Sequence, residues 1–243
     1  MGDGSGPSLE RKGKSEFLTL SALLALSASG CFLLYGLRLA ISGKVAYAGL
    51  VWNLVLAMVP YLIAAVGVHL IARAPEGRRS LIAVPVAALW LVFYPNAPYI
   101  FTDFIHVINK TYLRTAPSDW LGLNALLWYD LLMNAAFAFI GHFIGLVSMW
   151  LIQGGLEKAW GARPARALVG AAILFSGFGI YLGRFSRLNS WDLVFDLRRA
   201  IGEIVEATVD PKAMLFSAAF SLFILLTYAA LVVFKRINLP RKE

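Results

Sequence analysis

The sequence is poor in charge, holds a single cysteine and lacks the short motifs of common enzyme classes. Charged residues make up 15% of the chain and hydrophobic residues 59%, a balance that excludes an ordinary soluble domain. The one cysteine, Cys31, excludes an intrachain disulfide and a cluster of metal-binding thiolates. The phosphate-binding pattern GxxxxGK followed by Ser or Thr is missing, as are HExxH and GxSxG. The sequence therefore identifies no cofactor and leaves open whether the protein is an enzyme.

Long apolar runs make up most of what is present. An α-helix rises 1.5 Å per residue, so about 20 apolar residues cross a hydrocarbon core of about 30 Å. The runs predict an all-α, polytopic helical bundle of about six spans in the lipid bilayer. The expected spans are residues 17–41, 47–72, 80–94 with a continuation, 124–152, 167–183 and 213–234. We expect one transmembrane domain over 17–236, a disordered tail at 1–16 and a short tail at 237–243.

The positive charges are distributed as topology signals. The formal net charge is +8, but lysine and arginine lie almost entirely in the connections between apolar runs, which argues against nucleic acid as a partner. If the N-terminus is inside, the larger share of the 22 basic residues falls on the inner side. Cytoplasmic loops carry such an excess, so both termini are predicted to be cytoplasmic.

The connection between the fifth and sixth runs has a helical pattern of its own. Apolar residues recur there at helical spacing, with charged residues on the opposite side. Such a segment is typical of an amphipathic helix lying at the membrane interface, here before the last span. The apolar positions are Val194, Leu197, Ile201, Ile204, Val205 and Thr208.

Small residues four apart occur in the fourth and fifth runs. The pairs are Gly141 with Gly145, and Gly179 with Gly183. In lipid, such spacing lets helix backbones approach closely. We therefore expect these two spans to pack tightly against each other.

The stretch FYPNAPYIFTDFIH, residues 93–106, interrupts the third span with two prolines. Pro95 and Pro98 remove two backbone donors and are expected to push Tyr94 and Ala97 towards extended conformations. The third span is therefore predicted to be broken at these prolines. Groups freed at membrane depth need partners from protein or water, and Asn96 is suited to supply one.

Polar side chains from three places reach the same predicted side of the membrane. They follow the proline break, open the fourth span and leave the fifth span in YLGRFSRLNSWD, residues 181–192. Together they predict an outward-facing polar pocket. The candidate ligand-binding residues are Asn96, Tyr99, Thr102, Asp130, Arg184, Arg187, Asn189 and Asp192.

The same groups also allow structural and chemical alternatives. Arg184 or Arg187 with Asp103 or Asp130 would form interhelical ion pairs that hold the fold. Asp103 and His106, three apart on a helical face, are candidate catalytic residues.

Two further alternatives concern a cap and a metal. Asn189 with Asp192 three residues later resembles a helix cap with an acid in the first turn. Asp103, His106 and Asp130 offer oxygen and imidazole ligands, so they are candidate metal ligands.

The two polar strings resemble a family of bacterial multi-pass membrane proteins named domain of unknown function 1361. That family has the pattern F-x-P-N-A-P-Y-x-x-T-D-x-x-H, followed by Y-L-G-R-F-x-R-x-N-S-W-D. The resemblance implies a bacterial cytoplasmic-membrane protein and no particular activity. It singles out Pro95, Asn96, Pro98, Tyr99, Thr102, Asp103, His106, Arg184, Arg187, Asn189, Trp191 and Asp192.

Three functions fit these observations. The favoured one is binding of a small or lipid-linked ligand for transport or sensing, since interrupted helices supply such sites in transporters. A structural or accessory subunit with a membrane-protein partner is the second. The third is a membrane-embedded enzyme using Asp103 and His106, with Arg184 or Arg187 holding an anionic substrate.

Overall fold

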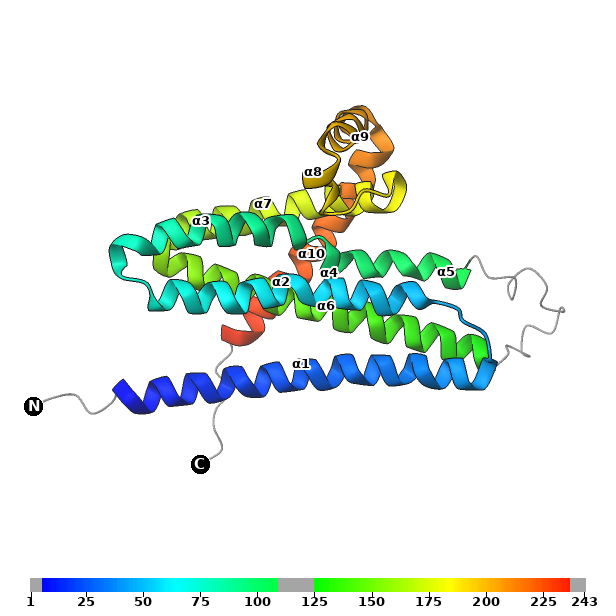
Figure 1. Cartoon of the computed structure of the whole chain (residues 1–243), viewed down its shortest axis with the longest axis horizontal. Coiled ribbons are helices and arrows are strands. Elements are labelled where there is room, and N and C mark those ends of the chain that lie inside the picture. Colours follow the sequence, from blue (N-terminus) through cyan, green and yellow to red (C-terminus); the bar gives the residue numbers. More distant parts are fainter. Residues whose placement is uncertain (1–5, 109–124, 237–243) are drawn as a thin grey trace, which may run out of the picture.

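The computed structural model describes residues 6–108 and 125–236, and the regular elements in this part are all helices (Figure 1). Six of them, counting the third with its continuation, are long and apolar enough to cross a membrane. The predicted all-α bundle is thereby confirmed. The long helices are α1 (Gly6–Ser42), α2 (Ala48–Arg73), α3 (Glu76–Phe93), α6 (Ala125–Trp160), α7 (Ala162–Tyr181) and α10 (Pro211–Arg236).

The expected domain, 17–236, ends with the last residue of α10, whereas its expected start does not coincide with the start of α1. The helix α1 begins at Gly6, inside the stretch 1–16 that was expected to be a disordered tail. Residues 1–5 and the tail 237–243 lie outside the described residues, as does the connection 109–124.

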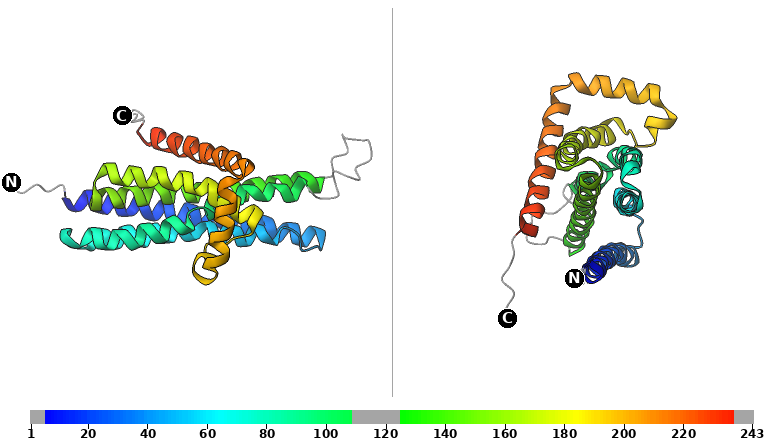
Figure 2. Two further views of the ribbon diagram at one scale, coloured as in Figure 1. Left: turned by 90° about the horizontal axis from the view of Figure 1, so that it is seen from above. Right: turned by 90° about the vertical axis from the view of Figure 1, so that its left-hand side faces the viewer.

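The α6 helix is the centre of the bundle. It packs against α2, α7, α1 and α3. Its buried residues recur every three or four positions near its start, as on one helical face, whereas residues 144–149 are buried on every side of the helix. The helix α10 packs mainly on α7. The amphipathic segment forms α9 (Leu197–Val209), which crosses the long helices steeply instead of running along them (Figure 2).

The third span is irregular at the prolines but stays helical. After α3 the chain forms α4 (Asn96–Tyr99), the 3₁₀ helix η1 (Ile100–Phe104) and α5 (Ile105–Ile108). Tyr94 has φ −57° and ψ −39°, so the expected extended conformation at this residue is wrong. The chain tightens instead, because Ala97 N–H donates to the Tyr94 carbonyl at 3.1 Å, a shorter-range bond than an α-helix makes.

Side chains donate hydrogen bonds to two backbone carbonyls just before the break. Asn96 Nδ2 donates to the Phe93 carbonyl at 2.9 Å. Ser190 Oγ, which follows the fifth span, donates to the Val92 carbonyl at 2.9 Å. Asn96 Nδ2 also donates to Ser190 Oγ at 3.2 Å. The break is therefore joined to a segment almost a hundred residues further along the chain.

Both glycine pairs lie against the break. A Cβ added at Gly145 would lie 2.6 Å from the Ala97 Cβ, and one at Gly179 would lie 3.2 Å from Pro95. Gly141 and Gly183 face Ile100 and Tyr99 in the same way. The helices α6 and α7 do contact each other, but their glycines let the broken segment approach both of them.

A buried ion pair holds α1 to α6. Arg38 Nε donates to Asp130 Oδ1 at 3.0 Å and Arg38 Nη2 to Oδ2 at 3.3 Å; the two side chains are 2% and 0% exposed. Tyr47 donates to Asp130 Oδ2 at 3.0 Å. Arg38 Nη1 donates to Ser42 Oγ at 2.7 Å and to the Lys44 carbonyl at 3.0 Å. The partner of Asp130 is therefore an arginine of the first span, whereas the sequence suggested Arg184 or Arg187.

We expect Gly145→Ala to destabilise the protein by about 1–3 kcal/mol, because its Cβ would overpack against Ala97. Gly154, on the same helix, has open space around it, so Gly154→Ala should keep or slightly raise the stability. Thermal unfolding of both variants in one membrane mimetic measures the difference. Equal melting temperatures would contradict this packing.

Asp130→Asn should lower the free energy of unfolding by about 3–5 kcal/mol, because Arg38 would stay buried without its counter-charge. The double variant Arg38→Met/Asp130→Leu removes both charges and should recover most of that loss. Denaturation of the three proteins in the same detergent is the measurement. A double variant as unstable as Asp130→Asn would show that the pair is not the cause.

Candidate functional site

Asp103 is the buried centre of a polar cluster that joins three spans. It lies in η1, and Asn53 of α2 donates from Nδ2 to Asp103 Oδ2 at 2.7 Å. Arg184 Nη1, from the turn after α7, lies 3.7 Å from Asp103 Oδ1. His106 Nε2 lies 3.8 Å from the same oxygen, with its side chain 55% exposed. One carboxylate thus connects the second, third and fifth spans.

The turn after α7 places Arg184 on this carboxylate. The π-helix η3 (Leu182–Ser186) widens the end of the fifth span. Arg187 then adopts a left-handed conformation with φ 54°, and Leu188 N–H donates back to the Leu182 carbonyl at 3.2 Å. The chain reverses here, so the segment 188–190 comes to lie beside the proline break.

Asp192 supports the same segment as a cap. It begins the short helix α8 (Asp192–Phe195), and its Oδ2 accepts from the Asn189 backbone N–H at 2.7 Å. The two residues therefore interact through the Asp192 carboxylate and the Asn189 backbone N–H. The Asn189 side chain takes no part in this bond. Thr102 also bonds locally, because its Oγ1 donates to the Tyr99 carbonyl at 2.8 Å.

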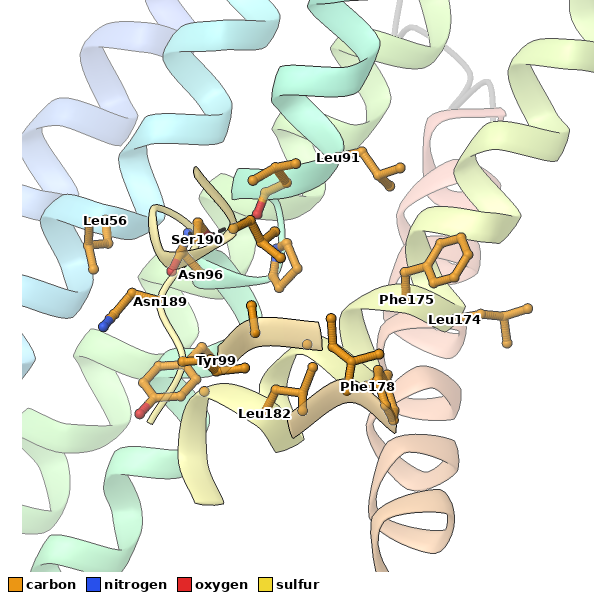
Figure 3. Close-up of a pocket in the computed structure, with 18 of the residues that line it drawn as sticks. Leu56, Leu91, Asn96, Tyr99, Leu174, Phe175, Phe178, Leu182, Asn189 and Ser190 are labelled. Carbon is orange, nitrogen blue, oxygen red and sulfur yellow. Dashed lines mark hydrogen bonds between the residues drawn. The ribbon is translucent and has the colours of Figure 1, made fainter. Parts of the chain in front are cut away.

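A cavity of about 680 Å³ lies between α2, the proline break, α7 and the segment that leads from η3 into α9 and α10. Figure 3 shows its two sides, with Asn96, Tyr99, Asn189 and Ser190 gathered on one and Leu174, Phe175 and Phe178 on the other. We call the first side, with Asn53, the polar wall. The three α7 residues form the apolar wall.

The sequence-predicted residues divide into groups. Asn96, Tyr99 and Asn189 line the cavity. Asp103 and Arg184 do not line it, but Asn53 connects them to it. The residues outside both the cavity lining and the Asp103 cluster are Thr102, Asp130, Arg187 and Asp192.

Sequence reasoning missed two residues of the polar wall. Asn53 is an amide within an otherwise apolar span, and a polar residue at such a place is a signal that could have found it. Ser190 lies inside the second polar string, but its bond to the Val92 carbonyl has no sequence pattern of its own.

The candidate metal ligands do not come together. Asp103 and His106 are close, whereas Asp130 of α6 is paired with Arg38 of α1. Within residues 6–108 and 125–236, no three His, Cys, Asp or Glu side chains are grouped so that they could hold a metal ion.

The junction of α9 and α10 closes the cavity from a third direction. Asp210 Oδ1 accepts from the Lys212 backbone N–H at 2.9 Å, and Oδ2 accepts from Tyr181 Oη at 2.9 Å. The Lys212 bond and then the Tyr181 bond lower the pKa of Asp210 below its ordinary 3.8. The stability that the ionised Asp210 contributes is fully present above pH 3.8, and it is lost as the pH falls through the lowered pKa. At neutral pH the Asp210 carboxylate is therefore ionised and can accept both hydrogen bonds.

Comparison with known proteins gives the family. Neither the curated proteins nor the solved structures contain a match to the chain. The family described as "Protein of unknown function (DUF1361)" matches residues 52–227. That range holds the proline break, the Asp103 cluster and the cavity, and it begins after α1 and Arg38. The chain belongs to this family.

Proposed function

We propose that the protein binds a lipid or lipid-linked ligand in the cavity beside the broken span, as a step in transport or sensing. The observation that carries this proposal is the two-sided cavity of about 680 Å³ next to an exposed membrane-facing surface. Its volume is within the range of about 300–1,000 Å³ that is typical of small-molecule sites. Leu174 and Phe175 of the apolar wall are 67% and 61% exposed, which supports entry from the side.

A lateral opening makes the polar wall the source of selectivity. An apolar chain that leaves the bilayer for an apolar wall gains little, because the lipid tails around it are equally apolar. Hydrogen bonds at Asn96, Tyr99 and Asn189 are different, since hydrocarbon offers them no partner. The head group of the ligand therefore decides which molecule stays bound.

The basic residues support an orientation for this site. With both termini in the cytoplasm, the proline break and α9 belong to the outer half of the membrane. Leu197, Ile201 and Val205 on α9 are exposed and apolar, which suits a helix resting on the outer interface. The ligand would then come from the outer leaflet of a bacterial cytoplasmic membrane.

A structural role is the second candidate. Asp103 is buried and has Asn53, Arg184 and His106 around it, which is what an interhelical lock requires. The enzymatic alternative has less support, because His106 does not line the cavity where a substrate would lie.

Thr208→Trp should remove the bound ligand, because Thr208 lines the cavity from α9 and indole would fill that space. Its neighbour Val209 is highly exposed and outside the lining, so Val209→Trp is the matched control. Native mass spectrometry of gently purified proteins should find a lipid-like adduct on wild type and the control, and not on Thr208→Trp. Equal adducts on all three, or none on any, would count against the site.

Asp103→Asn should lower stability by about 1–3 kcal/mol, because partly exposed Arg184 would lose its counter-charge. The folded variant should still carry the ligand, since Asp103 lies behind the polar wall. Thermal unfolding and native mass spectrometry on the same samples measure both effects. Loss of the adduct from a folded variant would instead indicate that Asp103 contacts the ligand.

A further inference from the structure

We propose that the ligand's head group is uncharged and rich in hydroxyl groups, so that the cavity selects a neutral glycolipid over an anionic phospholipid. This inference rests on the proposed function and names its ligand class. Within the described part of the chain, no Asp, Glu, Lys, Arg or His lines the cavity. The polar wall consists of neutral amides and hydroxyls, with Trp52 also in the lining.

Three charged residues close to the cavity have partners, and Arg187, which precedes the lining residue Leu188, is exposed and outside the lining. Arg184 is paired with Asp103, Asp192 accepts from the Asn189 backbone, and Arg199 donates to the Ser186 carbonyl at 3.2 Å. A phosphate brought into the cavity would lose water without gaining a cation from its lining. Burying an unpaired charge is far more costly than burying a neutral group that makes hydrogen bonds.

Two asparagines of the polar wall, Asn53 and Asn96, have their NH₂ groups engaged within the protein. Asn53 must present its NH₂ group to the Asp103 carboxylate, which can only accept, and Asn96 presents its NH₂ group to the Phe93 carbonyl and Ser190. Both asparagines line the cavity, and within the described residues their amide oxygens accept no hydrogen bond, so these oxygens are available as acceptors. Hydroxyl groups supply donors to such oxygens, whereas an ionised phosphodiester supplies none.

The aromatic groups fit the same ligand class. Trp52 and Tyr99 line the cavity near the asparagines, and aromatic rings combine an apolar face with a polar edge group. A sugar ring likewise has apolar C–H faces and polar hydroxyls. The apolar wall of Leu174, Phe175 and Phe178 then receives the acyl chain.

The test uses the full-length protein in nanodiscs, transferred from a detergent without a sugar head group. Each nanodisc contains a phosphatidylcholine background with monoglucosyl diacylglycerol, diacylglycerol or phosphatidylglycerol at equal amounts. Native mass spectrometry should find the glucosyl lipid retained about tenfold over the other two, which corresponds to about 1.4 kcal/mol. Retention of phosphatidylglycerol or plain diacylglycerol at the same level would overturn the head-group inference and leave the lipid site standing. Failure to retain any lipid above the Thr208→Trp background would overturn the proposed function itself.

A positive charge introduced into the polar wall tests the head-group preference independently. Asn189 is exposed and lines the cavity, so Asn189→Lys should fold, lose preference for the glucosyl lipid and retain more phosphatidylglycerol. Phe195→Lys adds the same charge at an exposed position outside the lining and should keep the wild-type preference. An equal shift in both variants would mean that surface charge decides retention, and it would overturn the inference.

Discussion

This structure depends on one constraint, which is that backbone N–H and C=O groups must find hydrogen-bond partners where there is no water. The prolines at 95 and 98 interrupt the third span, and each freed carbonyl at membrane depth costs several kcal/mol unless it finds a donor. At this break the Tyr94 carbonyl accepts from the Ala97 backbone N–H, and the side chains of Asn96 and Ser190 donate to the Phe93 and Val92 carbonyls. Since Ser190 comes from beyond the fifth span, satisfying the break fixes the position of that distant segment. The hydrogen bonds between Asn96, Ser190 and these carbonyls therefore also bring the residues of the polar wall together.

Close approach on two sides holds the repaired segment in place. Glycines of α6 and α7 allow Ala97 and Pro95 to lie where any side chain would collide. Lipid offers no hydrophobic drive for helix association, so such packing and the buried hydrogen bonds have to supply it. The Asp103 cluster adds a charged connection from α2 to η3 across the same segment. The proline break, the glycines of α6 and α7 and the Asp103 carboxylate therefore form one unit of the fold.

The sequence was informative wherever one strong physical rule decides the outcome. Apolar length gave the six candidate spans, and proline chemistry located the irregular part of the third. The sequence was less informative about which charged residues form ion pairs, because any acidic residue could pair with any arginine on the same predicted side. Asp130 and Asp103 looked equivalent, yet Asp130 pairs with Arg38 and Asp103 lies near Arg184. The glycine pairs likewise indicated close approach without indicating that the broken segment would be the neighbour.

The charged residues of the two polar strings act behind the cavity rather than inside it. Asp103 takes the amide hydrogens of Asn53, and this fixes which atom of that asparagine faces the cavity. Arg184 in turn places a positive charge 3.7 Å from this carboxylate, which offsets its charge behind the wall. An acid and a base can thus be needed at a site that contacts only neutral groups of its ligand. Under the proposed function, the strongest sequence signals mark residues that support the site, and the asparagines of the polar wall would contact the ligand.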